Sequence, residues 1–375
     1  MLIETDAFVV GCGPVALFLV FELGLHGIHA HMVDVQAAPG GQCISLYPDK
    51  PIYDIPAMPV CTGRELIQNL LRQVAPFAPG IHLGLQVCTL GRQSDGRWLA
   101  STCRLLSSVQ KCPKSPQFLA RTVFIAAGAG AFVPKELPVP GLSVFIGHQV
   151  FYNTPIKNLA SESKSKSKSK SKSKSKHTPA LFADKNVVLV GGSDDAVANT
   201  IALAQGCPNS ITLIYRRDRL QVSADRLAHL SCLRTQGLVQ FVAGQITAIH
   251  TTEDTLTSVA VSTPTGPSLH LPVDTLLVYA GLSPKLGPVA QWGLKLQRRQ
   301  LEVDRETFAT SADGIFAVGD VVTYPGKQKL IVCGFYEATQ AASAAATRLW
   351  PEQPSALLYT SSSALLQQRL GVVAG

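Results

Sequence analysis

The chain lacks the sequence features that mark a secreted or membrane-spanning protein. Its N-terminus, MLIETDAFVV, contains two acidic residues and no basic ones, unlike a secretory signal peptide. The apolar run at 15–25 has only 11 residues and includes Glu22, so it is too short to cross a bilayer. The 9 cysteines have no regular spacing, which favours a reducing compartment over a disulfide framework. We therefore expect a cytoplasmic protein without membrane contact.

The net positive charge of the chain comes almost entirely from one segment. The formal net charge is +8, but seven lysines alternate with serines from Lys164 to Lys176, and without them the balance is 8 − 7 = +1. No aromatic residue is interleaved with these lysines, so nucleic-acid binding is not expected. Alternating Ser and Lys cannot bury apolar surface, and we expect a disordered loop insertion at 160–178. As an alternative, its charge could attract an acidic partner.

The first forty residues have the pattern strand, glycine-rich turn, helix, strand. An apolar run at Ala7–Val10 predicts a buried strand, Val15–His26 a helix, and Ile28–Val33 a second strand that ends at Asp34. The turn GCGPVA has glycines where a tight turn and a pyrophosphate at the helix N-terminus require them. A carboxylate at position 34 can bind ribose hydroxyls. The pattern predicts a dinucleotide site.

The same pattern returns later in the chain. It comprises a strand at Asn186–Val190, the turn GGSDDA, a helix to about Gln205 and a strand at 210–215. Serine stands where the second glycine of the turn is expected. Two arginines end the second strand, where an acidic residue would suit NAD, and guanidinium groups suit the 2′-phosphate of NADPH. The expected NADPH-binding residues are Gly191, Gly192, Ser193, Asp194, Arg216 and Arg217.

Two such units some 180 residues apart predict two separate dinucleotide-binding domains. With 375 residues and 46% hydrophobic content, the chain can bury a large core. The expected fold class is α/β, with two Rossmann-like, three-layer ββα domains. Further strands are expected at 96–104, 246–261 and 269–277. Glycines near 126–130 and 279–282 are expected to lie at the hinges between the domains.

Several other motifs resemble the ferredoxin (flavodoxin)–NADP reductases of the thioredoxin-reductase-like type. The resemblance covers nearly the whole chain except the lysine–serine segment and its flanks. The motifs are GGQ at 40–42, LYPDK at 46–50, IYD at 52–54, AAGAGAF at 126–132, TSADGIFAVGD at 310–320 and GFYEATQA at 334–341. The resemblance implies an FAD domain made of 1–132 and 283–375, an inserted NADPH domain at 133–282, and a homodimer.

The resemblance also implies which residues contact FAD. Asp34 would bind the adenosine ribose, Asp320 the ribityl and pyrophosphate part, and Ser361, in a C-terminal extension, would lie at the isoalloxazine ring. The expected FAD-binding residues are Gly11, Gly13, Pro14, Asp34, Gly41, Gln42, Tyr47, Val87, Phe132, Asp320 and Ser361. Gln221 departs from the family pattern, in which a further arginine is often found after the arginine pair.

The resemblance implies hydride transfer from NADPH to N5 of FAD, followed by single-electron transfer to ferredoxin or flavodoxin. The cofactor carries this chemistry, so neither a catalytic side chain nor a metal ion is expected.

Other readings of the sequence remain open. A disulfide reductase would need a redox cysteine pair, but no C-x-x-C occurs, and Cys43 has Pro48 where a partner would stand. A flavin monooxygenase fingerprint beginning at Phe145 fails because position 151 is phenylalanine, so His148 is expected to lie in a turn or at the surface. A thioredoxin-reductase-like flavoprotein with a different acceptor is possible, as is a non-catalytic FAD-binding regulator that lost NADPH use through Ser193.

Overall fold

The computed structural model divides the chain into two compact units. Unit 1 consists of Met1–Phe132 and Pro284–Gly375, and unit 2 of Val133–Ser283. The lysine–serine segment and Gln221 lie outside the described residues. Those residues are 1–104, 115–154, 156, 182–206, 208–220, 222–264, 266–352 and 358–372.

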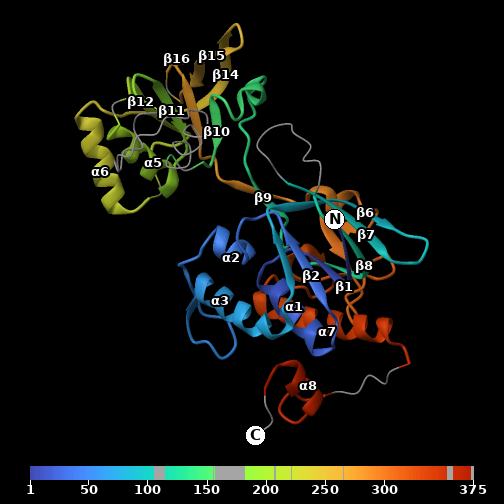
Figure 1. The fold of residues 1–375 in the computed structure, drawn as a ribbon. Coiled ribbons are helices and arrows are strands. Elements are labelled where there is room, and N and C mark those ends of the chain that lie inside the picture. Colours follow the sequence, from blue (N-terminus) through green and yellow to red (C-terminus); the bar gives the residue numbers. More distant parts are fainter. Residues whose placement is uncertain are drawn as a thin grey trace, which may run out of the picture. The chain divides into compact units, whose positions relative to one another are not determined.

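The chain crosses between the two units twice (Figure 1). β9 (Ala131–Pro134) leads into unit 2 and β18 (Leu282–Lys285) leads back to unit 1, and the two strands form a small sheet. Unit 2 is therefore an insertion within the sequence of unit 1. No helix in the described ranges is both long enough and apolar enough to cross a membrane.

A 7-stranded sheet forms the centre of unit 1. Its order is β5-β2-β1-β8-β7-β6, and β21 pairs with β8. The strands β1, β2, β5, β8 and β21 pair in parallel, whereas β6 and β7 add an antiparallel hairpin beside β8. The strands are β1 (Leu2–Val10), β2 (Ala30–Asp34), β5 (Gly80–Leu83), β6 (Leu85–Arg92), β7 (Trp98–Arg104), β8 (Gln117–Ile125) and β21 (Ile315–Ala317).

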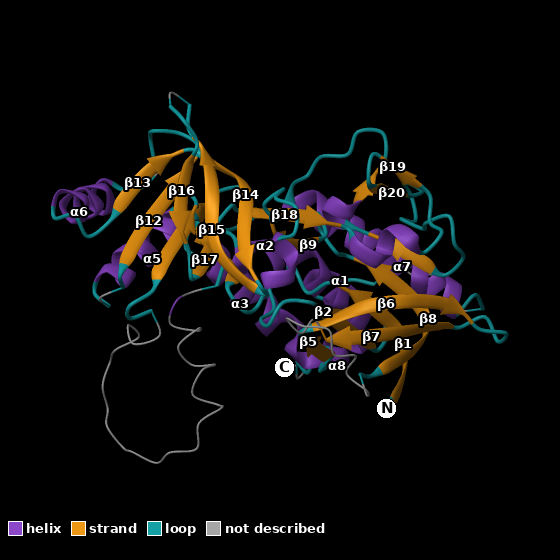
Figure 2. Ribbon diagram, turned by 90° about the horizontal axis from the view of Figure 1, so that it is seen from above, coloured by secondary structure: helices purple, strands orange, loops and turns teal. Residues whose placement is uncertain are grey.

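Alternate residues of β1 face opposite sides of the sheet, as strand geometry requires. Ala7 and Val9 pack in one core with the helices, and Phe8 and Val10 pack in a second core with residues of β6, β7 and β20. Figure 2 shows the helices and strands of the unit. The helices are α1 (Pro14–Leu25), α2 (Gly41–Ser45), α3 (Gly63–Val74), α7 (Ile331–Leu349) and α8 (Ala364–Arg369).

Short elements complete unit 1. A capping box starts α3, because Thr62 accepts a hydrogen bond from the Glu65 amide and the Glu65 side chain accepts one from the Thr62 amide. The short elements are β3 (Pro51–Ile52), β4 (Cys61–Thr62), β19 (Leu296–Gln297), β20 (Gln300–Glu302), β22 (Val322–Thr323) and the 3₁₀ turns η1 (Ala75–Phe77), η5 (Gly287–Gln291) and η6 (Gly319–Val321).

Unit 2 has the same layering. Its parallel sheet has the order β10-β17-β11-β12-β13, and β14, β15 and β16 form a separate antiparallel sheet. One core lies between the two sheets, and the other packs the parallel sheet against α5 and α6. The elements are η2 (Leu142–Phe145), β10 (Val150–Tyr152), β11 (Asn186–Val190), α5 (Asp194–Ala204), β12 (Ser210–Tyr215), α6 (Ala224–Thr235), β13 (Gln240–Ala243), β14 (Gln245–Thr252), β15 (Thr255–Ser262), β16 (Leu269–Pro272) and β17 (Thr275–Val278).

A disulfide that the cysteine spacing did not indicate links β6 to β7. Cys88 and Cys103 are 15 residues apart in sequence, with their Cα atoms 6.5 Å apart, within the usual range for a disulfide. Cys88 lies at a bulge between Val87 and Thr89. Among the other cysteines that the structure describes, the free ones are Cys12, Cys43, Cys61, Cys232 and Cys333.

The two-residue turn between β19 and β20 has an unfavourable backbone. Gln297 pairs with Gln300, so Arg298 and Arg299 form the turn, with φ angles of 49° and 66°. Positive φ at both positions is typical of a type I′ turn, which favours Asn-Gly. A left-handed conformation costs an L-residue with a Cβ about 1–2 kcal/mol. No other two consecutive non-glycine residues in the described ranges both have positive φ.

A histidine pair is expected to make the stability of unit 1 depend on pH. Nδ1 of His31 lies 2.9 Å from Nε2 of His82. Burial, and then the charges of His82 and His29, lower the pKa of His31 to about 4, and burial also lowers the pKa of His82. The unfolded chain protonates these rings near pH 6.5. Between pH 6.5 and 4 the unfolded state therefore binds more protons, and stability falls as the pH falls.

We expect the melting temperature to drop by roughly 2–4 °C between pH 7 and pH 5, a modest change because solvent screens these partly exposed rings. His31→Phe should weaken this dependence, because the substitution removes the ring with the larger shift. Melting curves at pH 7, 6 and 5 measure the effect, with His229→Gln on α6 as a control. An unchanged pH dependence in His31→Phe would contradict the assignment.

Candidate functional site

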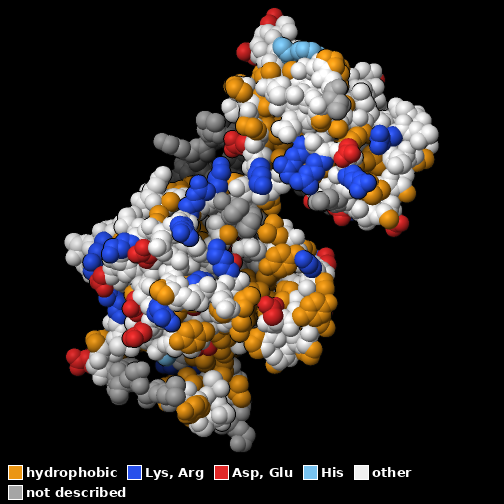
Figure 3. All heavy atoms as spheres, turned by 180° about the vertical axis from the view of Figure 1, so that it is seen from behind, with side chains coloured by type: hydrophobic (Ala, Val, Ile, Leu, Met, Phe, Trp, Pro, Cys, Tyr) orange, Lys and Arg blue, Asp and Glu red, His pale blue; other side chains and the backbone are white. Residues whose placement is uncertain are grey.

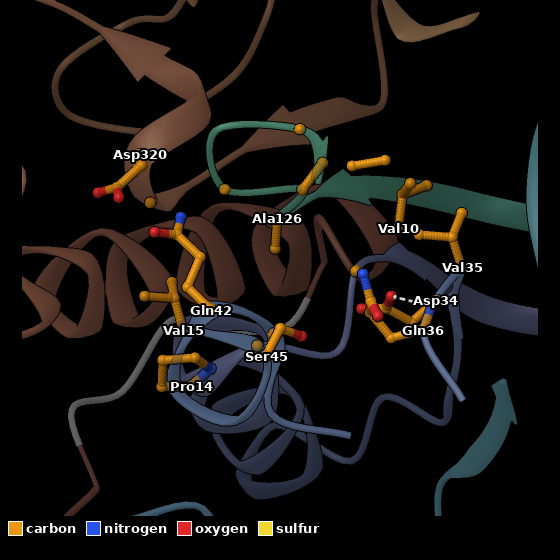
Figure 4. Close-up of a pocket in the computed structure, with 18 of the residues that line it drawn as sticks. Val10, Pro14, Val15, Asp34, Val35, Gln36, Gln42, Ser45, Ala126 and Asp320 are labelled. Atoms are coloured by element: carbon orange, nitrogen blue, oxygen red, sulfur yellow. Dashed lines mark hydrogen bonds between the residues drawn. The ribbon is translucent and has the colours of Figure 1, made fainter. Parts of the chain in front are cut away.

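A cavity lies in unit 1 where β1, β2 and β8 end, the edge at which parallel α/β sheets bind ligands. Figure 4 shows Asp34 and Gln36 at one end of it and Gln42 and Asp320 at the other. The remaining walls come from the glycine turn after β1, the segment 126–131, residues 85–87 of β6, the start of η5, and Leu330 with Ile331.

The glycine turn after β1 brings bare backbone to the cavity. Gly11 has a φ of +112°, and a Cβ at this position would collide with the carbonyl oxygen of Ala126. Gly13 has an ordinary φ of −79° and forms the N-cap of α1. A Cβ on Gly13 would have no neighbour closer than the Cα of Gly41, at 4.0 Å. The absence of a side chain at position 13 therefore leaves open space beside the helix N-terminus, where anions bind.

Asp34 is held in place by the backbone around it. One carboxylate oxygen accepts a hydrogen bond from the Cys12 amide at 2.7 Å, and the other accepts one from the Gln36 amide at 2.8 Å. Burial raises the pKa of Asp34, and these backbone hydrogen bonds oppose the rise. The side chain is thus fixed at the end of β2 with acceptor capacity left for a hydroxyl.

Gln42 and Tyr47 reach the cavity from α2 and the residues after it. The Tyr47 hydroxyl lies 3.8 Å from Sγ of Cys43. Burial, followed by the nearby Cys43, raises the pKa of Tyr47, so its hydroxyl remains a hydrogen-bond donor. Burial also raises the pKa of Cys43, which disfavours the thiolate that disulfide chemistry requires.

A buried ion pair holds the turn that contains Asp320. Glu337 on α7 is 0% exposed, and its side chain accepts hydrogen bonds from the Gly319 amide at 2.6 Å and the Tyr324 hydroxyl at 2.7 Å. Lys327, whose side chain is 6% exposed, pairs with the same carboxylate. Gly319 and Asp320 line the cavity, so this network shapes the cavity wall. The GFYEATQA motif contains Glu337, but the sequence did not reveal these contacts.

The residues around this cavity fit FAD. A Cβ on Gly41 would lie only 3.0 Å from the Cα of Gly13. These two glycines, which are neighbours in space, leave a surface free of side chains for a pyrophosphate. Carboxylate acceptors lie near both ends, in Asp34 and Asp320.

In unit 2 the turn after β11 accommodates serine. Ser193 has φ −84° and ψ 165°, which any residue adopts, and its hydroxyl caps α5 by accepting a hydrogen bond from the Ala196 amide at 3.4 Å. The positions that require glycine are the two before it. A Cβ on Gly191 would lie 2.6 Å from the Tyr279 carbonyl oxygen, and one on Gly192 would collide with the Tyr215 ring. The Ser193 hydroxyl keeps its own proton for donation to a phosphate.

Arg216 and Arg217 line a broad hollow at the end of β12. Arg219 lines the same hollow and was missed from the sequence, although it follows the pair by only two residues. Asp194, the first residue of α5 after Ser193, does not line this hollow, and its side chain pairs with Arg226 at 3.1 Å.

Most of the residues expected at FAD line one cavity. They are Gly11, Gly13, Pro14, Asp34, Gly41, Gln42, Tyr47, Val87 and Asp320. Gln36, Leu330 and Ile331 line it as well and were not expected. The side chain of Phe132 lies outside the described residues. Ser361 is exposed in the turn before α8 and is not a lining residue of this cavity.

Comparison with known proteins gives the family. The sequence pattern of the pyridine nucleotide-disulphide oxidoreductases matches residues 5–346. The ferredoxin–NADP reductase of Albidiferax ferrireducens is 48% identical over 373 residues, covering 99% of this chain and 96% of that protein. The ferredoxin–NADP reductase of Methylibium petroleiphilum is 46% identical, covering 99% and 93%.

The fold has a solved counterpart. The crystal structure of the thioredoxin reductase of T. acidophilum aligns with a TM-score of 0.53 and 19% identity, covering 92% of this chain and 99% of that one. The expected α/β class with two Rossmann-like, thioredoxin-reductase-like domains is confirmed. The chain belongs to the pyridine nucleotide-disulphide oxidoreductase family and, within it, to the ferredoxin–NADP reductases.

Proposed function

We propose that this chain is an FAD-dependent oxidoreductase that transfers electrons between NADPH and ferredoxin. One observation carries the proposal: the two βαβ units end their second strands with opposite charges. In unit 1 the carboxylate of Asp34 suits ribose hydroxyls, and in unit 2 Arg216 and Arg217 suit a 2′-phosphate. The ferredoxin–NADP reductases that are 46–48% identical to the chain support the same function.

We assign FAD to unit 1 and NADPH to unit 2. Bound FAD supplies hydride acceptance and single-electron delivery. The protein's own contribution would be orientation: Asp34 would hold a ribose, Gly13 would leave room for the pyrophosphate, and the amide of Gln42 and hydroxyl of Tyr47 would contact the other half of the cofactor. The Ser193 hydroxyl can donate to the NADPH pyrophosphate while it caps α5, which disfavours a regulator that has lost NADPH use.

The partners follow from the same proposal. Ferredoxin is the electron carrier that the related reductases name, and flavodoxin is a second candidate. A homodimer, a cytoplasmic location, a contact of Ser361 with the isoalloxazine ring and a contribution of Phe132 to the FAD site remain predictions that belong to this proposal.

Anaerobic titration of the FAD-loaded protein tests the function. We expect NADPH to bleach the flavin absorbance near 450 nm at far lower concentration than NADH, and ferredoxin to restore the absorbance. Arg216→Gln with Arg217→Gln should weaken NADPH binding at least about 100-fold, because the double variant removes two charged hydrogen bonds that contribute roughly 1.5–3 kcal/mol each. NADH binding should change little.

Arg92→Gln, on β6 of unit 1, is the matched control and should behave as wild type. If neither nucleotide bleaches the flavin, the chain is the FAD-binding regulator. If NADPH bleaches it and ferredoxin does not reoxidise it, the acceptor is a different one.

A further inference from the structure

The β19–β20 turn combines an unfavourable backbone with exposed positive charge. Arg298 and Arg299 are both exposed and hold left-handed conformations in which Asn-Gly would be more stable. Lys295 lies nearby in sequence and is also exposed. Backbone strain at an exposed position is a pointer to function, here to a role for the guanidinium groups themselves.

The charge of this segment is unbalanced locally. Residues 284–301 contain Lys285, Lys295, Arg298 and Arg299 and no acidic residue, and the next residue, Glu302, lies opposite Lys295, where its amide donates to the Lys295 carbonyl oxygen at 3.0 Å. None of these four forms a salt bridge with another residue that the structure describes. By contrast, the arginines of the β6–β7 hairpin are paired: Arg92 with Asp313 at 2.8 Å, and Arg97 with Glu4 at 2.9 Å and Asp95 at 2.7 Å.

A direct link connects the turn to the FAD cavity. Gln300, the residue after Arg299, donates hydrogen bonds from its side chain to the carbonyl oxygens of Asp320 at 3.1 Å and Val322 at 2.9 Å. β20 also pairs with β22. Asp320 lines the cavity, so the basic turn is anchored to the segment that forms its wall. Electron transfer requires a carrier to dock close to the cofactor, and Gln300 connects the turn to a residue that lines the cofactor cavity.

Basic side chains occur in several groups on the face that Figure 3 shows. A docking surface must therefore be argued from individual residues. The Arg298–Arg299 turn is favoured because its charge is unpaired, exposed and tied to the cavity wall.

We propose that Lys295, Arg298 and Arg299 form the docking surface for an acidic electron-carrier protein of the ferredoxin type. The proposal rests on the function proposed above and names the surface that this function would use. Unpaired surface charge accelerates the encounter with a partner of opposite sign and fixes its orientation. Arginine also offers a fork of donors for surface carboxylates.

Replacing both turn residues by R298N/R299G tests the proposal without weakening the fold, because Asn-Gly is the preferred pair for this turn. We expect an unchanged or higher melting temperature, unchanged NADPH-dependent reduction of ferricyanide, and a KM for an acidic [2Fe–2S] ferredoxin raised roughly fivefold at low salt. The difference should vanish near 1 M salt, where the screening length is about 3 Å. Direct binding of the ferredoxin, measured by calorimetry, should weaken to the same extent.

Two further variants separate charge from shape and from position. R298K/R299K keeps both charges and should retain most of the ferredoxin affinity, whereas R92Q/R97Q removes two arginines from the β6–β7 hairpin and should match wild type. An unchanged KM in R298N/R299G, with wild type still reducing ferredoxin, would overturn the docking surface and leave the function standing. If wild type reduces ferricyanide but neither binds nor reduces ferredoxin, the proposed function fails and the docking surface with it.

Discussion

Glu337→Ala is expected to destabilise unit 1 by about 3–5 kcal/mol, because it leaves the buried ammonium of Lys327 without its partner. The same substitution removes the acceptor that holds the Gly319 amide, so the Asp320 turn loses its fixed position and FAD should dissociate readily. Urea unfolding measures the first effect, and the flavin content of the purified protein measures the second.

A double variant distinguishes the unpaired charge from the lost hydrogen bonds. Glu337→Ala with Lys327→Met should recover part of the stability, since no charge then remains buried, but it should not recover FAD binding. Tyr324→Phe removes one hydrogen bond from the network and should cost only about 1 kcal/mol. If Glu337→Ala retained wild-type stability and full flavin content, the buried ion pair would have no part in shaping the site.

Gly11→Ala and Gly13→Ala should fail in different ways although they lie in one turn. At Gly11 the new methyl group collides with the Ala126 carbonyl oxygen at a φ of +112°, so we expect a loss of roughly 2–4 kcal/mol in stability. At Gly13 the φ is ordinary and the nearest atom is 4.0 Å away. The fold of Gly13→Ala should therefore tolerate the methyl group. The FAD affinity of this variant should fall at least about tenfold, or ~1.4 kcal/mol, because the methyl group occupies the space of the pyrophosphate.

Melting curves of the two apoproteins, followed by FAD titration with flavin fluorescence, measure both effects. Ala126→Gly, at the residue after β8, keeps the carbonyl oxygen and serves as a control for general loosening of the turn. Equal loss of stability in the two glycine variants would show that Gly13 has a structural role that the open space beside it does not indicate.

The elements that the sequence predicted best are those set by local pattern. The strands Asn186–Val190 and Ser210–Tyr215 have the bounds expected for them, and α1 begins one residue before the predicted start. Apolar runs, glycines and caps lie close together in the chain, so their signal can be read directly. β1 begins at Leu2, five residues before the predicted start, because its polar first half pairs with β8. Such pairing depends on a partner more than 100 residues away.

The site residues likewise divide into those that local sequence pattern predicts and those that only the folded chain reveals. Asp34 could be predicted because a βαβ unit places the end of its second strand beside the turn. The pairing of Glu337 with Lys327 and Gly319, the bond between Cys88 and Cys103, and the hydrogen bonds of Gln300 to the Asp320 segment could not. Each joins residues whose spacing matches no repeating pattern, and only the folded chain brings them together.

The position of β21 has a consequence for synthesis on the ribosome. Residues 123–125 of β8 pair with Ile315–Ala317, so the last third of this strand has an open edge until the chain has grown by about 190 further residues. All of unit 2 emerges during that interval, because its sequence is continuous from Val133 to Ser283. An unpaired strand edge invites association with other chains. A nascent chain that stopped before residue 315 would therefore contain every residue of unit 2 and a unit 1 sheet still open to aggregation.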